Sequence, residues 1–186
     1  MTSAKIDIVC MGEAMVEFTR VNSSKGEVLY IRSLGGDTSN CAISAARQGV
    51  NVAYLSAVGD DQFGKIAIDT WLAEGIDVSQ VLVDPNSPTG IYFIDPAPEG
   101  RNFTYYRAGS AASRMSSISS SRALLSRTAI LHLSAITQAI SIASTEPSFE
   151  AIGIVKKNGG RVSYDTNLRL NLWDLEEARR VINETL

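Results

Sequence analysis

Short apolar runs alternate with amphipathic segments along most of the chain. The runs are almost continuously apolar, which is typical of strands in a parallel sheet that helices cover on both faces. Between them apolar residues recur at helical spacing, and several of these segments end at a glycine. This alternation predicts an α/β fold with a doubly wound parallel sheet. The predicted strands span residues 6–11, 52–58, 78–83, 129–134 and 161–165, and the predicted helices span about 38–49, 61–75 and 147–158 and begin again near Asp174.

Two pairs of segments show alternating apolar and polar residues instead of continuous apolar runs. Turn-forming residues separate the members of each pair, and prolines bracket the second pair. We therefore predict two β hairpins that stand outside the main layers. The serine-rich stretch 110–121 leads into an apolar run and is predicted to be a loop and a helix entry. The predicted hairpin strands are 15–20 with 27–33 and 90–95 with 101–107, within inserted segments of about 14–34 and 88–108.

Composition and charge exclude several kinds of partner. The chain has 17 Lys plus Arg and 20 Asp plus Glu, a net charge of −3, with no basic stripe, so we expect no nucleic-acid partner. No segment approaches the roughly 20 apolar residues that cross a bilayer, and the first residues lack the layout of a secretory signal. We therefore expect a cytoplasmic protein without a membrane partner.

Candidate metal ligands are few. Cys10 and Cys41 lie among apolar or small residues and are predicted to be buried free thiols, and His132 is predicted to be a core or strand-edge residue. Asp60 and Asp61 follow a strand and precede a helix, where carboxylates cap the helix and favour its dipole. We expect no metal bound by these side chains.

A glycine pair precedes the first predicted helix, in the string LGGDTSN at 34–40. Glycine lets the backbone approach a ligand closely, and a helix start offers free N–H groups. A tight turn with a helix cap is the alternative, and the spacing is not that of a nucleotide-binding phosphate loop.

An arginine lies between the aromatic end of a predicted strand and a loop of small residues, in the string YYRAGSAAS at 105–113. Aromatic rings offer a sugar an apolar face, and a guanidinium matches a carboxylate or phosphate through paired hydrogen bonds. The alternative is an edge-strand arginine that faces solvent.

Polar side chains also follow the strand at 161–165, in the string SYDTNLRLNLW at 163–173. The carboxyl ends of parallel strands are where ligands bind in open α/β sheets. Asp165, Asn167 and Arg169 are therefore candidate functional residues.

Together with VGDDQFG at 58–64, these strings in this order resemble the ribokinase-like (PfkB-type) carbohydrate kinases along essentially the whole chain. The resemblance implies a phosphotransferase with a Rossmann-like three-layer fold, in which the two hairpins form a small β lid over the sugar. In many members of the family the lid also makes the dimer contact, so a homodimer is expected.

Within the family, the strings at 105–113 and 165–173 are most similar to those of 2-keto-3-deoxygluconate kinases. The resemblance implies transfer of a phosphoryl group from ATP, with Mg, to the terminal hydroxyl of this sugar acid. Two arginines would neutralise the carboxylate, which fructose and ribose lack. The residues implied to bind the sugar acid are Gly35, Gly36, Asn40, Tyr92, Tyr106, Arg107 and Arg169, and those implied to approach the ATP phosphates are Asn167 and Arg169.

The chain departs from the family pattern in two places. Thr166 stands where the family commonly has proline, and the family's Gly-Ala-Gly-Asp string, whose Asp is the catalytic base, does not occur. We therefore expect the base and the rest of the ATP site to lie beyond Leu186, and this C-terminally truncated chain to be inactive by itself. A fructokinase- or ribokinase-type enzyme and a non-catalytic sugar-acid binding remnant are the alternatives.

Overall fold

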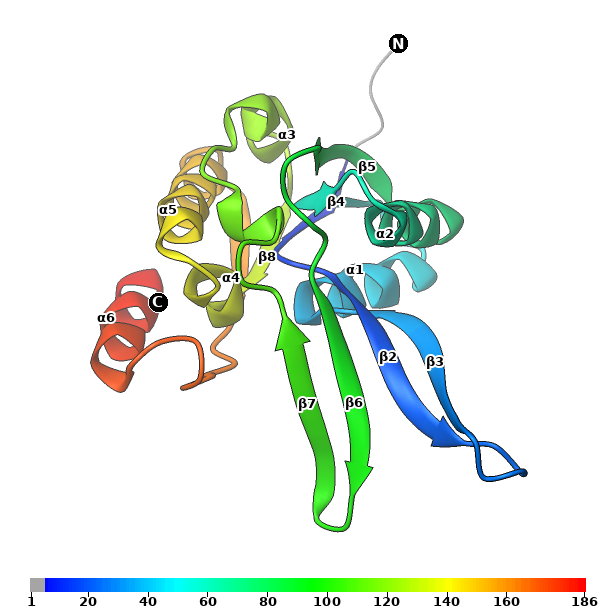
Figure 1. Ribbon diagram of the computed structural model, residues 1–186. Coiled ribbons are helices and arrows are strands. Elements are labelled where there is room, and N and C mark those ends of the chain that lie inside the picture. Colours follow the sequence, from blue (N-terminus) through cyan, green and yellow to red (C-terminus); the bar gives the residue numbers. More distant parts are fainter. Residues whose placement is uncertain (1–5) are drawn as a thin grey trace.

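The computed structural model describes residues 6–186, which form two sheets (Figure 1). The main sheet has five strands, all parallel, as predicted from the apolar runs. The first strand lies in the middle, and the chain adds strands first on one side of it and then on the other. In spatial order the strands are β5 (Asp77–Asp84), β4 (Val52–Gly59), β1 (Ile8–Met11), β8 (Ile130–Ser134) and β9 (Arg161–Asp165).

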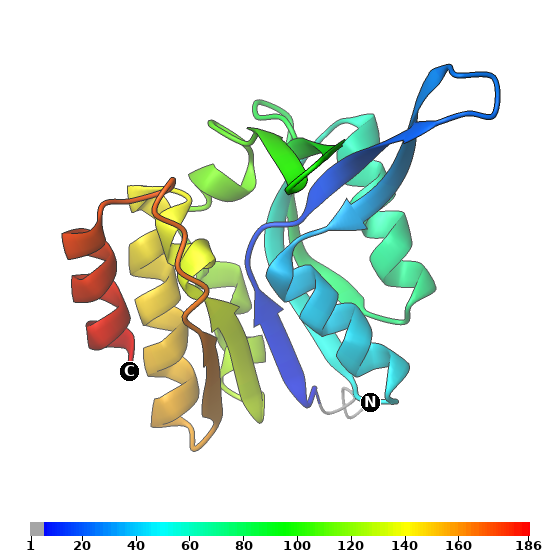
Figure 2. The same cartoon turned by 90° about the horizontal axis from the view of Figure 1, so that it is seen from below.

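Helices cover both faces of the main sheet (Figure 2). In β1, Val9 and Met11 point into the core on the side of α3 and α5, whereas Cys10 points into the core on the side of α1 and α2. The central strands β1 and β4 therefore bury both of their faces, which is why they are apolar almost throughout, whereas the edge strands β5 and β9 are half-buried to exposed and carry more polar residues. The predicted three-layer α/β fold is confirmed. The helices are α1 (Asp37–Arg47), α2 (Gln62–Ala73), α3 (Arg122–Leu125), α4 (Ala135–Ala139), α5 (Ile142–Lys157) and α6 (Leu175–Thr185).

The two predicted hairpins join into a single second sheet, here called the lid sheet (Figure 1). Each hairpin is antiparallel, and the two are joined by parallel pairing in which Glu17 lies opposite Tyr92. The sequence predicted the hairpins but not this pairing, which joins segments more than 70 residues apart. The strands are, in spatial order, β3 (Val28–Gly35), β2 (Met15–Asn22), β6 (Ile91–Ala97) and β7 (Gly100–Tyr106).

The structure differs from the sequence prediction after β8. The short helix α4 was not predicted; it is capped reciprocally by Ser134 and Thr137. Helix α5 begins at Ile142, ahead of the predicted start near Pro147, which lies inside the helix. This additional turn packs against α4, and the Thr145 hydroxyl donates to the Gln138 carbonyl oxygen at 2.9 Å. Tertiary contacts thus extend the helix beyond the point where a proline would favour its start. The serine-rich stretch forms two 3₁₀ turns, Ala112–Arg114 and Ser119–Ser121, that lead into α3.

The strand order places a topological switch point between β1 and β8. The connections that leave these two strands run to opposite sides of the sheet, which opens a crevice at their carboxyl ends. The lid sheet starts there as well, since β2 follows β1 after three residues. Within 6–186, none of the helices has both the length and the apolar character that a bilayer crossing requires.

Candidate functional site

A cleft of about 230 Å³ lies at this switch point, between the carboxyl ends of the main strands and the inner face of the lid sheet. Its lining comes from five parts of the chain that are distant in sequence. The lining residues are Glu13, Met15, Gly36, Asp37, Asn40, Tyr92, Phe103, Tyr105, Arg107, Ile136, Asn167, Arg169, Asn171 and Leu172.

The glycine pair allows the lid strand to approach the start of α1. A Cβ on Gly35 would lie 2.1 Å from the Tyr92 hydroxyl oxygen, and a Cβ on Gly36 would lie 2.6 Å from the Glu13 carbonyl oxygen. Gly36 also has a φ of 120°, a backbone conformation that residues with a side chain rarely adopt. It is the residue directly before the first turn of α1. Gly36 and Asn40 line the cleft, whereas Gly35 lies behind Tyr92 and makes room for it.

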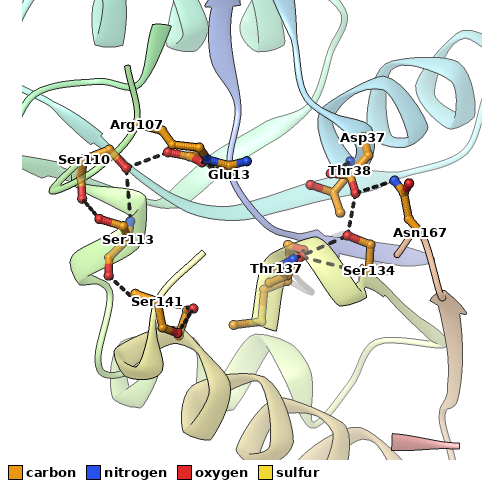
Figure 3. A network of polar contacts seen from close by, with 12 residues as sticks. Glu13, Asp37, Thr38, Arg107, Ser110, Ser113, Ser134, Thr137, Ser141 and Asn167 are labelled. Carbon is orange, nitrogen blue, oxygen red and sulfur yellow. Dashed lines mark hydrogen bonds and ion pairs between the residues drawn. The ribbon is translucent and has the colours of Figure 1, made fainter. Parts of the chain in front are cut away.

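Asp37 connects three elements at the floor of the cleft (Figure 3). Its Oδ2 accepts hydrogen bonds from the Ser134 hydroxyl at 2.5 Å and from the Asn167 side-chain amide at 3.3 Å. The Asn167 backbone N–H in turn donates to Asp165 at 3.0 Å. These bonds fix the loop after β9 against the start of α1.

Glu13 and Arg107 form a buried ion pair on the other side of the cleft (Figure 3). The Arg107 Nε donates to Glu13 Oε2 at 2.7 Å, and Nη2 contacts the same oxygen. The Ser110 hydroxyl donates to Glu13 Oε1 at 2.5 Å. Burial raises the pKa of the Glu13 carboxyl, and the charge of Arg107 and the bonds from Ser110 and Arg107 oppose that rise. The donors around both oxygens are those that an ionised carboxylate requires.

Aromatic rings form the lid side of the cleft. The Tyr92 ring stacks on the Tyr105 ring with centroids 5.5 Å apart, and the Tyr92 hydroxyl donates to Glu17. Burial acts to raise the pKa of Glu17, but hydrogen bonds from Tyr92, Thr19 and Ser33 outweigh it and leave that pKa lowered. An apolar ring face with a fixed hydroxyl at its edge suits a sugar.

Arg169 lies at the open side of the cleft and is exposed. Its Nη1 donates to the Leu168 carbonyl oxygen at 3.0 Å, and it makes no ion pair with any described residue. Arg107 and Arg169 therefore line one cleft. The positive charge of Arg107 is balanced by the Glu13 carboxylate, whereas no described carboxylate pairs with Arg169.

Tyr106 is the predicted site residue whose side chain the structure places elsewhere. It is 62% exposed and does not line the cleft; it lines a neighbouring, more apolar hollow with Phe63, Pro88 and Ile91, and Tyr105 and Arg107 line both. Successive strand residues point to opposite faces, so Tyr105, two residues before Arg107, shares the cleft face with it. That period of two was available in the sequence and would have indicated Tyr105. Glu13 was also missed, because no motif marked it.

The other residues considered as ligands, Asp61 and the two cysteines, lie outside the lining of the cleft. Asp61 caps α2, since its Oδ1 accepts from the N–H groups of Phe63 at 2.9 Å and Gly64 at 2.8 Å, which confirms the predicted role. Both thiols are free; Cys10 is buried, but Cys41 is only half-buried. Hydrogen bonds from Cys10 and His132 lower the pKa of Cys41 to about 5. The described residues contain no group of three side chains arranged to hold a metal ion.

An open parallel sheet whose switch-point crevice is covered by a small sheet of mixed parallel and antiparallel pairing is the architecture of an α/β protein with a ligand cleft. A family model described as "pfkB family carbohydrate kinase" matches residues 5–186 of the chain. The chain belongs to this family.

Relatives support the same assignment. The chain is 35% identical to the 2-dehydro-3-deoxygluconokinase of Thermoproteus tenax, over 98% of this chain and 57% of the relative. It is 32% identical to the probable fructokinase-7 of Arabidopsis thaliana, over 93% of this chain and 51% of the relative. A crystal structure of a PfkB protein from Polaromonas sp. JS666 superposes with a TM-score of 0.88 at 31% identity, covering 96% of this chain and 62% of that one. The chain thus spans little more than half the length of these curated relatives.

Proposed function

We propose that this chain supplies the acceptor-binding half of an ATP-dependent kinase for a sugar acid of the 2-keto-3-deoxygluconate type. The observation that carries the proposal is that Arg107 and Arg169, 62 positions apart in the chain (169 − 107), line the same cleft. A guanidinium binds a carboxylate through paired, charge-assisted hydrogen bonds. The Thermoproteus tenax relative, whose name denotes this activity, supports the choice of acceptor.

In this proposal the acceptor lies between the glycine turn and the lid. Asn40 and the backbone at Gly36 face its hydroxyl groups, and the rings of Tyr92 and Tyr105 cover an apolar face of the sugar. Gly35 contributes by leaving room for Tyr92. The free donors of Arg107 and Arg169 hold the carboxylate, and the lid excludes water from the reacting hydroxyl. Tyr106, in the other hollow, has no part in this arrangement.

ATP is the proposed phosphoryl donor, with Mg neutralising its phosphates. Among the described residues, Arg169 has free donors at the open side of the cleft, which suits a phosphate, while the Asn167 amide is engaged by Asp37. Arg169 would then contact the transferred group or the donor, and Asn167 would position the loop that carries it. No catalytic base is assigned to this chain, since Asp37 is held by Ser134 and Asn167 and the Gly-Ala-Gly-Asp string does not occur.

A neutral sugar such as fructose is the second candidate acceptor. Glu13 cancels the charge of Arg107, which leaves Arg169 as the uncompensated cation of the cleft lining. The similarity to the fructokinase of Arabidopsis thaliana is of the same order as the similarity to the sugar-acid kinase.

Calorimetric titration of the chain with 2-keto-3-deoxygluconate and with fructose distinguishes the two. We expect the sugar acid to bind more tightly, and Arg169→Gln to weaken its binding roughly 10- to 100-fold, since a hydrogen bond to a charged group contributes about 1.5–3 kcal/mol. Arg127→Gln, outside the cleft, is the matched control. Equal or tighter binding of fructose would contradict a sugar acid as the acceptor and favour a neutral sugar. Binding of neither compound would refute an acceptor site in this cleft.

A further inference from the structure

Glu13 is a buried carboxylate in the cleft that the family resemblance does not account for. It lies two residues after the end of β1, lines the cleft, and has only 1% of its side chain exposed. Its hydrogen-bonding partners, Arg107 and Ser110, come from the segment after β7, more than 90 residues away. An ionised carboxylate is costly to bury unless it is paired, so the pair with Arg107 is what retains it there.

The surrounding backbone leaves space for this side chain. A Cβ on Gly90 would lie 2.9 Å from Glu13 Oε1, and the Gly36 Cβ would clash with the Glu13 backbone. Ser110, itself buried, supplies a hydroxyl to the same oxygen. Three separate segments are thus shaped around Glu13.

The pair determines what Arg107 can offer a ligand. Glu13 Oε2 takes the Nε–H group and one Nη2 hydrogen, which leaves three of the five guanidinium N–H groups, two of them on Nη1. The Arg107 side chain is 14% exposed, and no hydrogen bond among the described residues involves its Nη1. The other charged groups at the cleft are Asp37, which is hydrogen-bonded to Ser134 and Asn167, and Arg169.

We propose that Glu13 is the positioning and specificity-determining residue of the acceptor cleft. It holds Arg107 by one edge, so that the other edge donates hydrogen bonds to the acceptor, and it cancels the charge of that arginine. Arg107 then orients the acceptor as a neutral pair with Glu13, and discrimination in favour of an anionic acceptor depends on Arg169. This inference rests on the proposed function, because it concerns the same acceptor.

The test combines Glu13→Gln, Arg107→Gln and the double variant in the full chain, with calorimetric titration of 2-keto-3-deoxygluconate and fructose at low and high salt. Glu13→Gln keeps the shape but removes the charge. We expect it to weaken fructose binding about tenfold through the loss of Arg107 orientation, and to weaken sugar-acid binding less, so that the ratio of affinities shifts toward the anion by roughly fivefold. This shift should shrink at high salt, because it is electrostatic.

Coupling between the two residues gives a second readout. In the Arg107→Gln background, Glu13→Gln should change fructose affinity less than about twofold, since Glu13 acts through Arg107. Ser110→Ala, which leaves both charges in place, is the control and should not shift the ratio. A merely structural role of Glu13 predicts equal weakening for both acceptors and no salt dependence, and that result would overturn the inference.

The test still distinguishes the two roles of Glu13 if one of the variants fails to fold. If Glu13→Gln does not fold, a double variant that melts close to the original protein supports the pair, and a double variant that is equally unstable contradicts it. If the original chain binds neither acceptor, the proposed function fails. If it binds them and Glu13→Gln leaves the ratio and the coupling unchanged, only this inference fails.

Discussion

The main sheet and the lid sheet are built from strands with opposite surroundings. All eight residues of β4 are buried, whereas all seven residues of β7 are exposed. The main sheet is covered by helices on both faces, so its strands are stabilised mainly by apolar burial. The lid sheet projects from one end of the molecule and relies on its hydrogen-bond ladder and on ring contacts such as Phe18 with Phe93 (Figure 1).

This difference separates stability from ligand binding. Elements with few buried apolar contacts open most easily, so the lid sheet is expected to be the less stable part. The cleft lies where the two sheets meet, and each contributes to its lining: Asp37 and Asn40 from the side of the main sheet, and Tyr92, Tyr105 and Arg107 from the lid. A floor that is more stable than its cover would suit a site that admits a ligand and then excludes water.

The largest expected contrast is between a core and a lid aromatic residue. Trp71 is fully buried against Tyr54 and donates to the Ser39 hydroxyl at 2.9 Å, whereas Phe103 is 48% exposed. Trp71→Ala should lower the free energy of unfolding by about 3–5 kcal/mol and Phe103→Ala by about 1 kcal/mol or less, measured by urea denaturation followed by circular dichroism. Comparable losses would mean that the lid contributes to stability as much as the core.

A smaller effect is expected where α2 meets the base of the lid. Asp61 caps α2, and its Oδ2 accepts from the Thr89 N–H at 2.8 Å, just before β6. Asp61→Ala should therefore cost about 1–2 kcal/mol of stability at pH 7, while Asp60→Ala, the adjacent exposed carboxylate, should cost little. Denaturation of both variants measures this.

The same carboxylate gives a pH dependence with a definite sign. Burial acts to raise the pKa of Asp61, but hydrogen bonds from Thr89, Gly64 and Phe63 outweigh it, so the folded-state pKa lies below the usual value of an aspartate. Its stabilisation is present above that value and is lost as the pH falls through the lower folded-state pKa. The difference in stability between the original chain and Asp61→Ala should therefore shrink as the pH falls below about 4, the ordinary pKa of an aspartate. A constant difference would assign the effect to packing instead.

The smallest effect on stability is expected on the outer part of the lid. Val28, Leu29, Tyr30 and Ile31 of β3 are all about half exposed, and the family resemblance predicts a homodimer through the lid. Ile31→Lys should change the unfolding free energy by less than about 0.5 kcal/mol but should reduce self-association in sedimentation experiments. Ser24→Lys, at the exposed turn between β2 and β3, adds the same single positive charge and is the control. Sedimentation as a monomer before the substitution would contradict the dimer.

Much of the main sheet could be predicted from sequence, because burial on both faces leaves a local pattern. The fully buried strand β4, predicted at 52–58, runs from Val52 to Gly59, and Asp174 caps α6 as the acidic first turn indicated. The cleft was predicted in part: Gly36, Asn40, Tyr92, Arg107, Asn167 and Arg169 all line it. Tyr106 does not, because the motif named adjacent residues whose side chains leave a strand on opposite faces.

The sequence by itself determined the order of the strands and of the longer helices, the two hairpins and the family, since each depends on residues that are close together in the chain. Only the tertiary structure decided that the hairpins form one lid sheet, that Gly35 leaves room for the Tyr92 side chain, and that Arg107 pairs with Glu13. These are contacts between segments 57 to 94 positions apart (92 − 35 and 107 − 13). A carboxylate paired across such a distance leaves no periodic or spacing signal, because its environment is created by the packing of the lid on the sheet and not by its neighbours in the chain.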